Sequence, residues 1–256
     1  MRQLPKSFIA RYAADAYALL CDFDGTLAPI VEDPSRARIS PMAKRALSTI
    51  SSRHPVVIVS GRPIAYLRER IALPHLWYAG NHGLEWRFGA VRGAFAAPAR
   101  TTKALRDVRR ALAVLAKRYP GTQLEDKRLS LSFHFRSLSV ADRTRLRKDV
   151  RAVCAPHVRA GVVMEEGHEF VFNIRPAQGF DKGSVARFAL QHMPKGVLPI
   201  FIGDDATDED AFHALRHGIT IRVGYRKGSA ARYYVRTRRD VDALLGELAA
   251  ALKRRA

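Results

Sequence analysis

The chain has 256 residues, of which 47% are hydrophobic, and its 44 Lys and Arg against 24 Asp and Glu give a formal net charge of +20. This composition excludes a disordered chain, and no apolar run approaches the ~18 residues of a membrane-spanning helix, so we expect a globular protein without a membrane segment. The two cysteines, Cys21 and Cys154, lie far apart without metal-ligand spacing, which favours a reducing cytoplasm over export.

Apolar segments alternate with amphipathic segments near both ends of the chain. The apolar segments predict buried strands at Tyr17–Cys21, Pro55–Val59, Leu76–Ala79, Leu198–Ile202 and Ile219–Val223. Helices are predicted at Ser40–Ser52 (with Pro41 in its first turn), Pro63–Ile71, Thr207–Leu215 and Asp240–Leu252. Apolar strands separated by helices indicate an α/β fold whose parallel sheet is covered on both faces, so ligands are expected at the carboxyl ends of the strands.

The middle of the chain has a different pattern. Long helices are predicted at Thr101–Tyr119 and Val140–Val153, and strand-like runs at Leu129–Arg136, Val162–Glu165 and Phe170–Ile174. In the first run, polar residues alternate with Leu129, Leu131, Phe133 and Phe135, as in a half-buried strand. We therefore predict a smaller α+β domain, residues 100–177, inserted into a core made of residues 1–99 and 178–256, with hinges at Pro98 and Arg175–Gly179.

Two aspartates follow the first predicted strand, at the point where its apolar run ends. Asp22 and Asp24 are two residues apart, so on an extended backbone both carboxylates point to the same side. Such a pair suits a divalent cation and a phosphoryl group, since one carboxylate can ligate metal and attack while the other handles a proton. The alternative is an Asp-Gly turn that only closes a hairpin.

Three further polar groups occur where the sheet argument expects them. Ser60 follows the second strand, Lys182 opens a helix after the insertion, and Asp204 and Asp205 follow the strand that ends at Ile202. Each has a structural alternative, namely a helix cap, a surface lysine and a capping box. Because they are chemically complementary and all lie at strand ends or helix starts, we interpret them together as one phosphoryl-transfer site.

In these four motifs the chain resembles the haloacid-dehalogenase-like (HAD) phosphatase superfamily, which implies a Rossmann-like parallel-sheet core with an inserted cap. The resemblance implies that Asp22 attacks phosphorus to form an aspartyl-phosphate and that Asp24 protonates the leaving oxygen and then activates water. It implies Mg²⁺ held by Asp22, the Asp24 carbonyl and Asp204, with Asp205 and Asp208 behind them or as alternative ligands. The phosphoryl oxygens would be held beside the nucleophile by Gly25, Thr26, Ser60, Gly61 and Lys182.

Longer motifs narrow the resemblance to the trehalose-6-phosphate phosphatase family. They are Leu27–Val31, Ala79–Glu85, Glu125-Asp126-Lys127, His134-Phe135-Arg136, Arg175-Pro176 and Gly203–Phe212. The family implies a sugar phosphate under the cap, whose hydroxyl groups require polar side chains. The candidates are His82, Glu125, Lys127, His134, Arg136, Asn173 and Arg175. The alternative for each is a polar residue on the wet face of a sheet, and for His134 and Arg136 a role in supporting the cap is favoured over contact with the sugar.

One position departs from the family pattern. Two residues before the Arg-Pro pair the family usually carries a glutamate, and this chain has Asn173. An amide offers a donor and an acceptor but no charge, so its hydrogen bonds to a sugar diol differ from those of a carboxylate. The nearby Glu165, Glu166 or Glu169 could compensate.

We therefore expect a cytoplasmic, monomeric, Mg²⁺-dependent phosphatase that hydrolyses trehalose 6-phosphate and binds no membrane. A phosphatase for another glycosyl phosphate is the alternative, and a mutase of the same superfamily is a further one. From another class, the chain could be a basic polyanion-binding protein on an inactive scaffold. Its charge is spread along the whole chain, as in Lys103, Arg106, Arg109 and Arg110 of one predicted helix, which is typical of a solvated face and predicts no specific nucleic-acid recognition.

Overall fold

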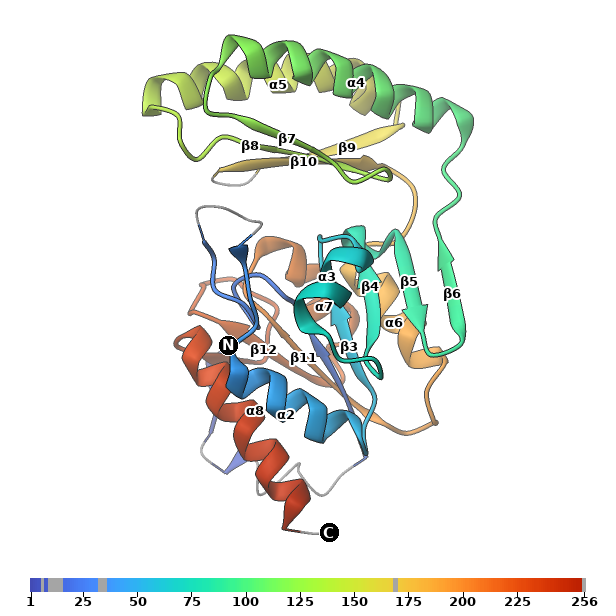
Figure 1. Cartoon of the computed structure of the whole chain (residues 1–256), viewed down its shortest axis with the longest axis vertical. Helices are drawn as coiled ribbons and strands as arrows, with labels where there is room; N and C mark the ends of the chain where they lie inside the picture. The colour runs from blue at the N-terminus through green and yellow to red at the C-terminus, as the bar shows by residue number, and fades with distance from the viewer. Residues whose placement is uncertain (6, 9–15, 32–35, 168–169, 255–256) are drawn as a thin grey trace. The chain divides into compact units, whose positions relative to one another are not determined.

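The structure is a computed structural model that describes residues 1–5, 7–8, 16–31, 36–167 and 170–254 (Figure 1). The chain divides into two compact units. The core unit consists of residues 1–94 and 180–256, and the inserted unit consists of residues 95–179. Within the described residues, no helix is long and apolar enough to cross a membrane.

One sheet forms the centre of the core unit, with its described strands in the order β1-β13-β12-β11-β2-β3-β4-β5-β6. In this spatial order, all neighbouring strands from β1 at the edge through β13, β12, β11, β2 and β3 to β4 are parallel. This confirms the predicted α/β class with a parallel sheet. The strands are β1 (Arg2–Gln3), β2 (Tyr17–Cys21), β3 (Val56–Val59), β4 (Trp77–Gly80), β5 (Glu85–Phe88), β6 (Val91–Ala94), β11 (Leu198–Gly203), β12 (Ile219–Val223) and β13 (Tyr233–Val235).

The sequence did not predict the antiparallel hairpin β5–β6 at one edge of this sheet, nor the short strands β1 and β13. Both hairpin strands carry charged residues, including Arg87 and Arg92, so neither forms an apolar run. Gly89, with a φ of 61°, lies in the two-residue turn that joins them.

Helices cover both faces of the core sheet (Figure 1). The predicted helices are present as α2 (Pro41–Ser51), α3 (Ile64–Ile71) and α8 (Arg238–Lys253) on one face, and as α6 (Lys182–Gln191) and α7 (Glu209–Ala214) on the other, with a 3₁₀ turn η3 (Ala206–Asp208) before α7. Because side chains of a strand alternate, Leu19 and Cys21 of β2 enter the first core while Ala18 and Leu20 enter the second. Both faces of the central strands are therefore buried, and the polar residues begin where the strands end.

The inserted unit is a four-stranded antiparallel sheet with two long helices. The strand order is β7-β8-β10-β9. Phe133 and Phe172 lie on the apolar face of the sheet and share a core with Val108 and Leu112 of the first helix and Val150 of the second. The elements are α4 (Ala99–Arg118), β7 (Gln123–Asp126), β8 (Leu131–His134), α5 (Val140–Arg159), β9 (Val163–Gly167) and β10 (Val171–Pro176).

Some predictions for this unit were wrong in detail. The strand predicted from Leu129 begins only at Leu131, because Arg128 has a left-handed backbone with φ of 69° and turns the chain. The polar strand β7 was missed, and α5 continues six residues past Val153, to Arg159. Arg175 and Pro176, predicted as part of a hinge, are the last two residues of β10.

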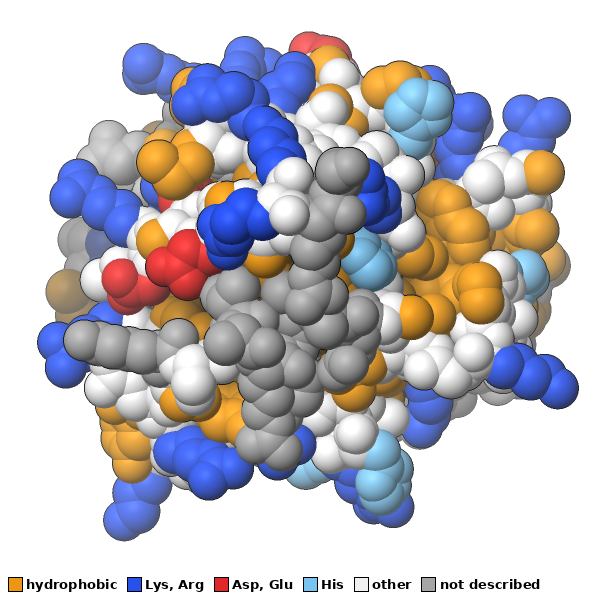
Figure 2. Space-filling view, turned by 90° about the horizontal axis from the view of Figure 1, so that it is seen from below, with side chains coloured by type: hydrophobic (Ala, Val, Ile, Leu, Met, Phe, Trp, Pro, Cys, Tyr) orange, Lys and Arg blue, Asp and Glu red, His pale blue; other side chains and the backbone are white. Residues whose placement is uncertain are grey.

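On the face drawn in Figure 2, Lys and Arg side chains lie scattered around the outline and do not merge into one basic patch. Exposed ion pairs on the inserted unit, such as Arg118 with Asp149 and Arg145 with Asp142, use part of this charge. This distribution agrees with the solvated faces expected from the sequence.

Candidate active site

The candidate site lies at the carboxyl ends of three adjacent strands of the core unit. β2 pairs in parallel with β11 on one side and β3 on the other, so the residues that follow these strands meet. Asp22 directly follows β2, and its backbone N–H donates to the Ile202 carbonyl of β11 at 2.9 Å. Ser60 directly follows β3. The site is thus a product of strand register.

Lys182 is the first residue of α6 and lies inside the site. Its Nζ is 3.0 Å from Asp22 Oδ2 and 2.8 Å from Asp208 Oδ1, and all three side chains are buried. Burial alone would lower the pKa of this amine, but Asp208 and Asp22 raise it above its usual value. Lys182 is therefore a charged ammonium at neutral pH, and the alternative of a surface lysine is wrong.

Asp24 lies in a different environment from Asp22. Arg62 donates to both of its carboxylate oxygens, from Nε at 2.7 Å and from Nη2 at 2.9 Å. The guanidinium also lies over the ring of Tyr66, 4.9 Å from its centroid. The two carboxylates of the Asp-Phe-Asp motif thus have separate partners, an ammonium for Asp22 and a guanidinium for Asp24.

Three carboxylates converge around Lys182. Asp22, Asp204 and Asp208 each offer an oxygen, and these oxygens lie within 4.8 Å of one another. Burial, followed by the charge of Asp208, raises the pKa of Asp204 to about 7 against the opposing effect of Lys182. Burial, followed by Asp208, Asp204 and Asp24, raises the pKa of Asp22 well above its usual value, again opposed by Lys182. Oxygen ligands with excess negative charge are the donor set that suits a hard divalent cation.

Gly25 and Thr26 pack against this carboxylate cluster. Thr26 Oγ1 donates to Asp204 Oδ1 at 3.1 Å. Gly25 has a φ of 78°, and a Cβ at this position would collide with the Asp204 carboxylate. A residue with a side chain would therefore push Asp204 out of the cluster.

The two further acids predicted near the metal lie in different places. Asp208 is fully buried in the cluster, and its Oδ2 accepts the backbone N–H groups of Asp204 and Asp205, both at 2.9 Å. The side chain of Asp205 instead accepts the N–H of Ala206 and caps η3. The cluster therefore includes Asp208 and does not include Asp205.

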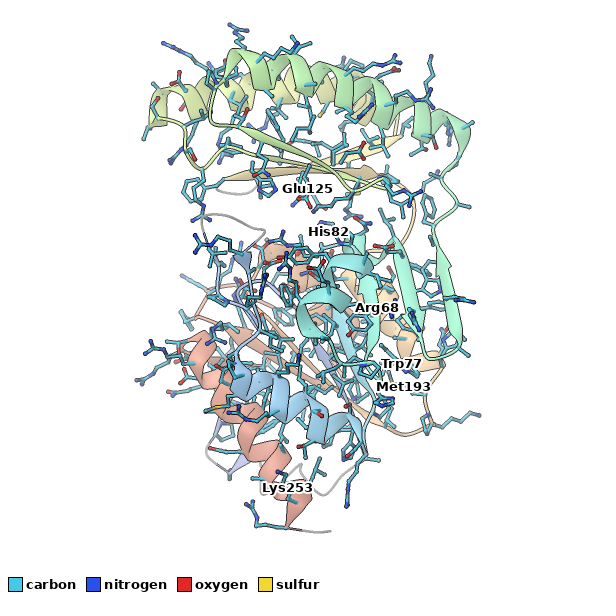
Figure 3. The ribbon with its side chains drawn as sticks, viewed as in Figure 1. Arg68, Trp77, His82, Glu125, Met193 and Lys253 are labelled. Atoms are coloured by element: carbon cyan, nitrogen blue, oxygen red, sulfur yellow. The ribbon has the colours of Figure 1, made fainter. Side chains whose placement is uncertain are left out.

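Ser60, Gly61 and His82 are in contact beside β3. Ser60 Oγ accepts the Arg62 backbone N–H at 3.2 Å, and its carbonyl accepts the His82 N–H at 3.0 Å. A Cβ on Gly61 would lie 2.6 Å from the His82 ring, so only glycine allows this approach. His82, labelled in Figure 3, is buried and has a left-handed backbone with φ of 59°. Strain of this kind is common where a backbone is held for function.

The rest of the Gly-Asn-His-Gly-Leu-Glu motif stabilises this turn. Asn81 also has a positive φ, of 52°, and its Nδ2 donates to Glu85 Oε1 at 3.0 Å. The same oxygen accepts the N–H of Ile64 at the start of α3, at 2.8 Å. A Cβ on Gly83 would lie 2.9 Å from the Asp181 carbonyl, next to Lys182. The motif thus positions His82 and packs against Asp181, the residue before Lys182.

The candidate substrate residues of the inserted unit lie mainly on the face of its sheet that is turned away from α4 and α5. Glu125 (labelled in Figure 3) is 3.2 Å from His134 Nε2 and 3.7 Å from Lys127 Nζ through its Oε2. Ser132 Oγ donates to Asn173 Oδ1 at 2.7 Å. We call the polar face the set Glu125, Lys127, Ser132, His134, Glu166, Asn173 and Arg175.

Glu166 is the neighbour of Asn173 on the adjacent strand. The two residues are register partners in the antiparallel pair of β9 and β10. Glu166 Oε1 accepts Arg175 Nη2 at 2.7 Å and Nε at 3.2 Å. Glu166 Oε2 is buried and has no hydrogen-bond partner among the described residues. Of the three acids named as alternatives, Glu166 borders Asn173, Glu165 is directed to Arg151, and Glu169 lies outside the described residues.

One predicted residue lies apart from the others, and one residue of the site was not predicted. Arg136 is exposed, with its guanidinium 4.6 Å from the centroid of the Phe170 ring, and it does not join the polar face. Arg62, which the sequence analysis passed over, contacts Asp24 directly. Its place two residues after Ser60, at the end of the strand next to β2, is the signal that could have identified it.

The parallel sheet, the acidic and basic groups at its carboxyl edge and the inserted α+β unit together define a haloacid-dehalogenase-like (HAD) protein. A family model described as trehalose-phosphatase matches residues 20–238. The chain therefore belongs to the trehalose-phosphatase family. Trehalose-phosphate phosphatase of Mycobacterium tuberculosis is 36% identical over 236 residues, covering 87% of this chain and 59% of that protein. The Mycobacterium ulcerans protein of the same name is 35% identical over 247 residues, covering 92% and 62%.

Solved structures share the fold. The C-terminal domain of Candida albicans trehalose-6-phosphate phosphatase superposes with a TM-score of 0.85 at 22% identity, over 97% of this chain and 98% of that chain. Aspergillus fumigatus trehalose-6-phosphate phosphatase gives a TM-score of 0.65 at 25% identity, over 98% and 99%. The chain spans about three fifths of the length of the mycobacterial relatives, so their activity transfers to it only as a proposal.

Proposed function

We propose that this chain is a Mg²⁺-dependent phosphatase that hydrolyses trehalose 6-phosphate to trehalose and phosphate. The observation that carries this proposal is the pairing of Asp22 with Lys182 and of Asp24 with Arg62 at the end of one strand. A nucleophile and an acid–base group need different environments, and these two carboxylates have them. Membership of the trehalose-phosphatase family supports the choice of substrate.

In the first step, an oxygen of the Asp22 carboxylate attacks phosphorus. A bond forms between that oxygen and phosphorus while the bond between phosphorus and the sugar oxygen breaks. Asp24 acts as the general acid and gives a proton to the departing sugar oxygen. Lys182 and the N–H and hydroxyl groups around Ser60 and Thr26 stabilise the charge on the phosphoryl oxygens.

In the second step, water attacks the phosphorus of the aspartyl-phosphate. Asp24, now ionised, removes a proton from this water, and the bond between phosphorus and the Asp22 oxygen breaks. Arg62 keeps the Asp24 carboxylate directed to one position through two hydrogen bonds, so the same group serves both steps.

The carboxylate cluster fits Mg²⁺, because three acids share a single ammonium and two of them have raised pKa values. Asp22, the Asp24 carbonyl and Asp204 would hold the ion, with Asp208 fixing Asp204 through its backbone N–H. When bound, Mg²⁺ supplies positive charge against the negative charge that develops on the phosphoryl group.

The inserted unit is proposed to act as the cap that binds the sugar through its polar face. Charged and amide side chains on one face of a sheet suit the many hydroxyl groups of a disaccharide. We further propose that Glu166 supplies the carboxylate that the family usually carries at the position of Asn173, since the two are cross-strand neighbours. A cytoplasmic location remains a prediction from the two cysteines, which are free and buried.

Phosphate release from a panel of sugar phosphates tests the function. We expect Mg²⁺-dependent release, fastest with trehalose 6-phosphate and slower with glucose 6-phosphate and other glycosyl phosphates. A faster reaction with another glycosyl phosphate would support the alternative substrate class. Absence of release from every member with Mg²⁺ present would refute the enzyme and leave a binding protein on this fold.

The carboxylate cluster predicts a pH-dependent stability. The pKa of Asp204 is about 7 in the folded protein and ~4 in an unfolded chain, so the folded state retains a proton that the unfolded state releases. The contribution of Asp204 to the free energy of unfolding is therefore fully present below pH ~4 and is lost as pH rises through ~7. Mg²⁺ is expected to raise the melting temperature more at pH 8 than at pH 5, as measured by thermal melts with and without the ion.

The variant Asp204→Asn provides the comparison. It removes the negative charge that burial and Asp208 disfavour, so without metal the variant should be more stable than the wild type at pH 8. The rise in melting temperature on adding Mg²⁺ should be lost. Asp107→Asn, a change at a half-buried acid of α4 in the inserted unit, serves as the control and should leave both measurements unaltered. An equal Mg²⁺ response in wild type and Asp204→Asn would contradict this assignment.

Glu166 is expected to determine affinity for the sugar. Glu166→Gln keeps the size and an acceptor but removes the charge, so KM for trehalose 6-phosphate should rise about 10-fold to 100-fold with little change in kcat. The matched control is Glu165→Gln, because the side chain of Glu165 is on the opposite face of β9 and is directed to Arg151. Initial rates over a range of substrate concentrations measure both constants.

Exchanging the two residues separates a sugar contact from a structural role. Asn173→Glu alone puts two carboxylates side by side across the strands and should weaken binding. The double change Glu166→Asn with Asn173→Glu restores one carboxylate and should recover most of the affinity. If Glu166→Gln and Glu165→Gln changed KM for trehalose 6-phosphate equally, Glu166 would not contact the sugar.

A further inference from the structure

The inserted unit contains a cavity on the helix side of its sheet, separate from the polar face. Its volume is about 420 Å³, within the range of ~300–1,000 Å³ typical of small-molecule sites. It lies between the first half of α4 and the turn that joins β7 to β8. Its lining comes entirely from residues 95–179 and includes Thr102, Leu105, Arg106, Arg109, Asp126 and Arg128.

The lining combines an apolar floor with cationic groups. Leu105 and Leu131 are buried members of the core of this unit, and they form part of the cavity wall. Thr102, Arg106 and Arg109 present one face of α4 at helical spacing. Arg110, which belongs to the same run of basic residues, does not line the cavity.

Among the described lining residues, Asp126 is the one acid, and it contacts two other lining residues. Asp126 Oδ2 lies 3.5 Å from Arg109, and its Oδ1 accepts the Arg128 backbone N–H at 2.9 Å. Arg106 and Arg128 form no ion pair with any side chain in the described part of the chain. Two guanidinium groups therefore border the cavity without an acid to balance them.

The turn holds Arg128 in an uncommon conformation. Its φ of 69° lies in the left-handed region, which is unfavourable for an L-residue other than glycine. Lys127 N–H donates to the Ser130 carbonyl at 2.9 Å and closes the turn. Glycine or asparagine would suit this backbone better, so the arginine is retained at a conformational cost.

We propose that this cavity is a binding site for a small organic phosphate. Guanidinium groups bind phosphate oxygens through paired hydrogen bonds, and Arg106 and Arg128 are available for them. The apolar floor and the volume leave room for a carbon body beside the phosphate. A ligand bound here would contact both α4 and the turn that carries Lys127. It would therefore reduce the local unfolding of these two segments.

Hydrogen–deuterium exchange of the full chain tests the site, with glycerol 3-phosphate as the probe. We expect saturable protection of α4 residues 102–109 and of the turn at residues 127–130, at millimolar or lower concentrations, and none with glycerol. Arg106→Ala with Arg128→Ala should weaken the apparent affinity at least tenfold. Arg110→Ala with Arg145→Ala removes two exposed charges outside the cavity and should change nothing.

Two further variants separate the site from unfolding and from the polar face. Arg128→Gly removes the cation and relieves the left-handed backbone, so it should weaken binding while it maintains or raises the melting temperature. Lys127→Ala should leave the protection of α4 intact. The proposal is overturned if α4 is not protected, or if sulfate protects it as well as glycerol 3-phosphate does. It is also overturned if the double variant Arg106→Ala with Arg128→Ala keeps the wild-type affinity, or if Lys127→Ala abolishes the protection.

Discussion

Replacing Asp22 by asparagine is expected to lower the rate of phosphate release by at least about 10⁴-fold, because an amide oxygen does not form the aspartyl-phosphate. The change keeps the volume of the side chain. Burial and the neighbouring acids raise the pKa of Asp22 against the opposing effect of Lys182, so a negative charge at this position costs the folded protein free energy and asparagine should not reduce stability. Lys182 keeps its contact with Asp208.

Three measurements test this expectation. Phosphate release gives the rate, thermal melting gives the stability, and mass spectrometry after a rapid acid quench detects the phosphoryl group on the wild-type chain. Asp107→Asn, at a half-buried position on α4 of the inserted unit, serves as the control and should keep wild-type activity. A covalent mechanism through Asp22 is untenable if Asp22→Asn releases phosphate at more than a trace rate.

The core of the site could be predicted from the sequence because strand ends mark it. In a parallel sheet covered by helices, the central strands are apolar throughout, so the first acid after Cys21 is visible as a break in the run. Parallel pairing then brings such breaks together at one edge. This physical rule connected Asp22, Ser60 and Asp204 across more than a hundred residues of sequence.

Contacts that depend on side-chain direction beyond a strand end could not be predicted in this way. The sequence places Arg62 near the site, two residues after Ser60, but Arg62 lies past the end of β3, where alternation no longer tells which way a side chain points, so its contact with Asp24 could not be predicted. Asp205 and Asp208 look equivalent in sequence. The turn η3 directs Asp208 into the cluster and leaves Asp205 as its cap.

In the inserted unit, sequence patterns gave the class of structure but not the register. β7 consists of Gln123, Leu124, Glu125 and Asp126, which have low strand propensity, and it pairs with the more apolar β8. The pairing of Asn173 with Glu166 likewise follows from the register of β9 and β10. The family glutamate is absent at Asn173, and Glu166 lies on another strand. Only the register shows that these two positions are neighbours.

Asp24→Asn is the second change with a large expected effect, and it separates the two chemical steps. With a sugar phosphate, whose leaving oxygen needs a proton, the rate should fall about 10²-fold to 10⁴-fold because general acid–base catalysis is lost. With p-nitrophenyl phosphate the leaving group departs without a proton, so the first step should proceed while the second still lacks its base. The variant should therefore release nitrophenol in a burst of one equivalent per enzyme, followed by slow turnover.

Rapid mixing with absorbance detection measures this burst, and Asp22→Asn should show none because no covalent intermediate forms. Arg62→Lys is the comparison for the positioning contact, since it keeps a positive charge near Asp24 but cannot donate to both carboxylate oxygens in the same geometry. Its rate should lie between those of wild type and Asp24→Asn, with an altered pH profile. A different result would contradict the proton-transfer role. If Asp24→Asn gave no burst with p-nitrophenyl phosphate and lost activity equally toward this compound and the sugar phosphate, the carboxylate would be needed to form the site rather than to transfer protons.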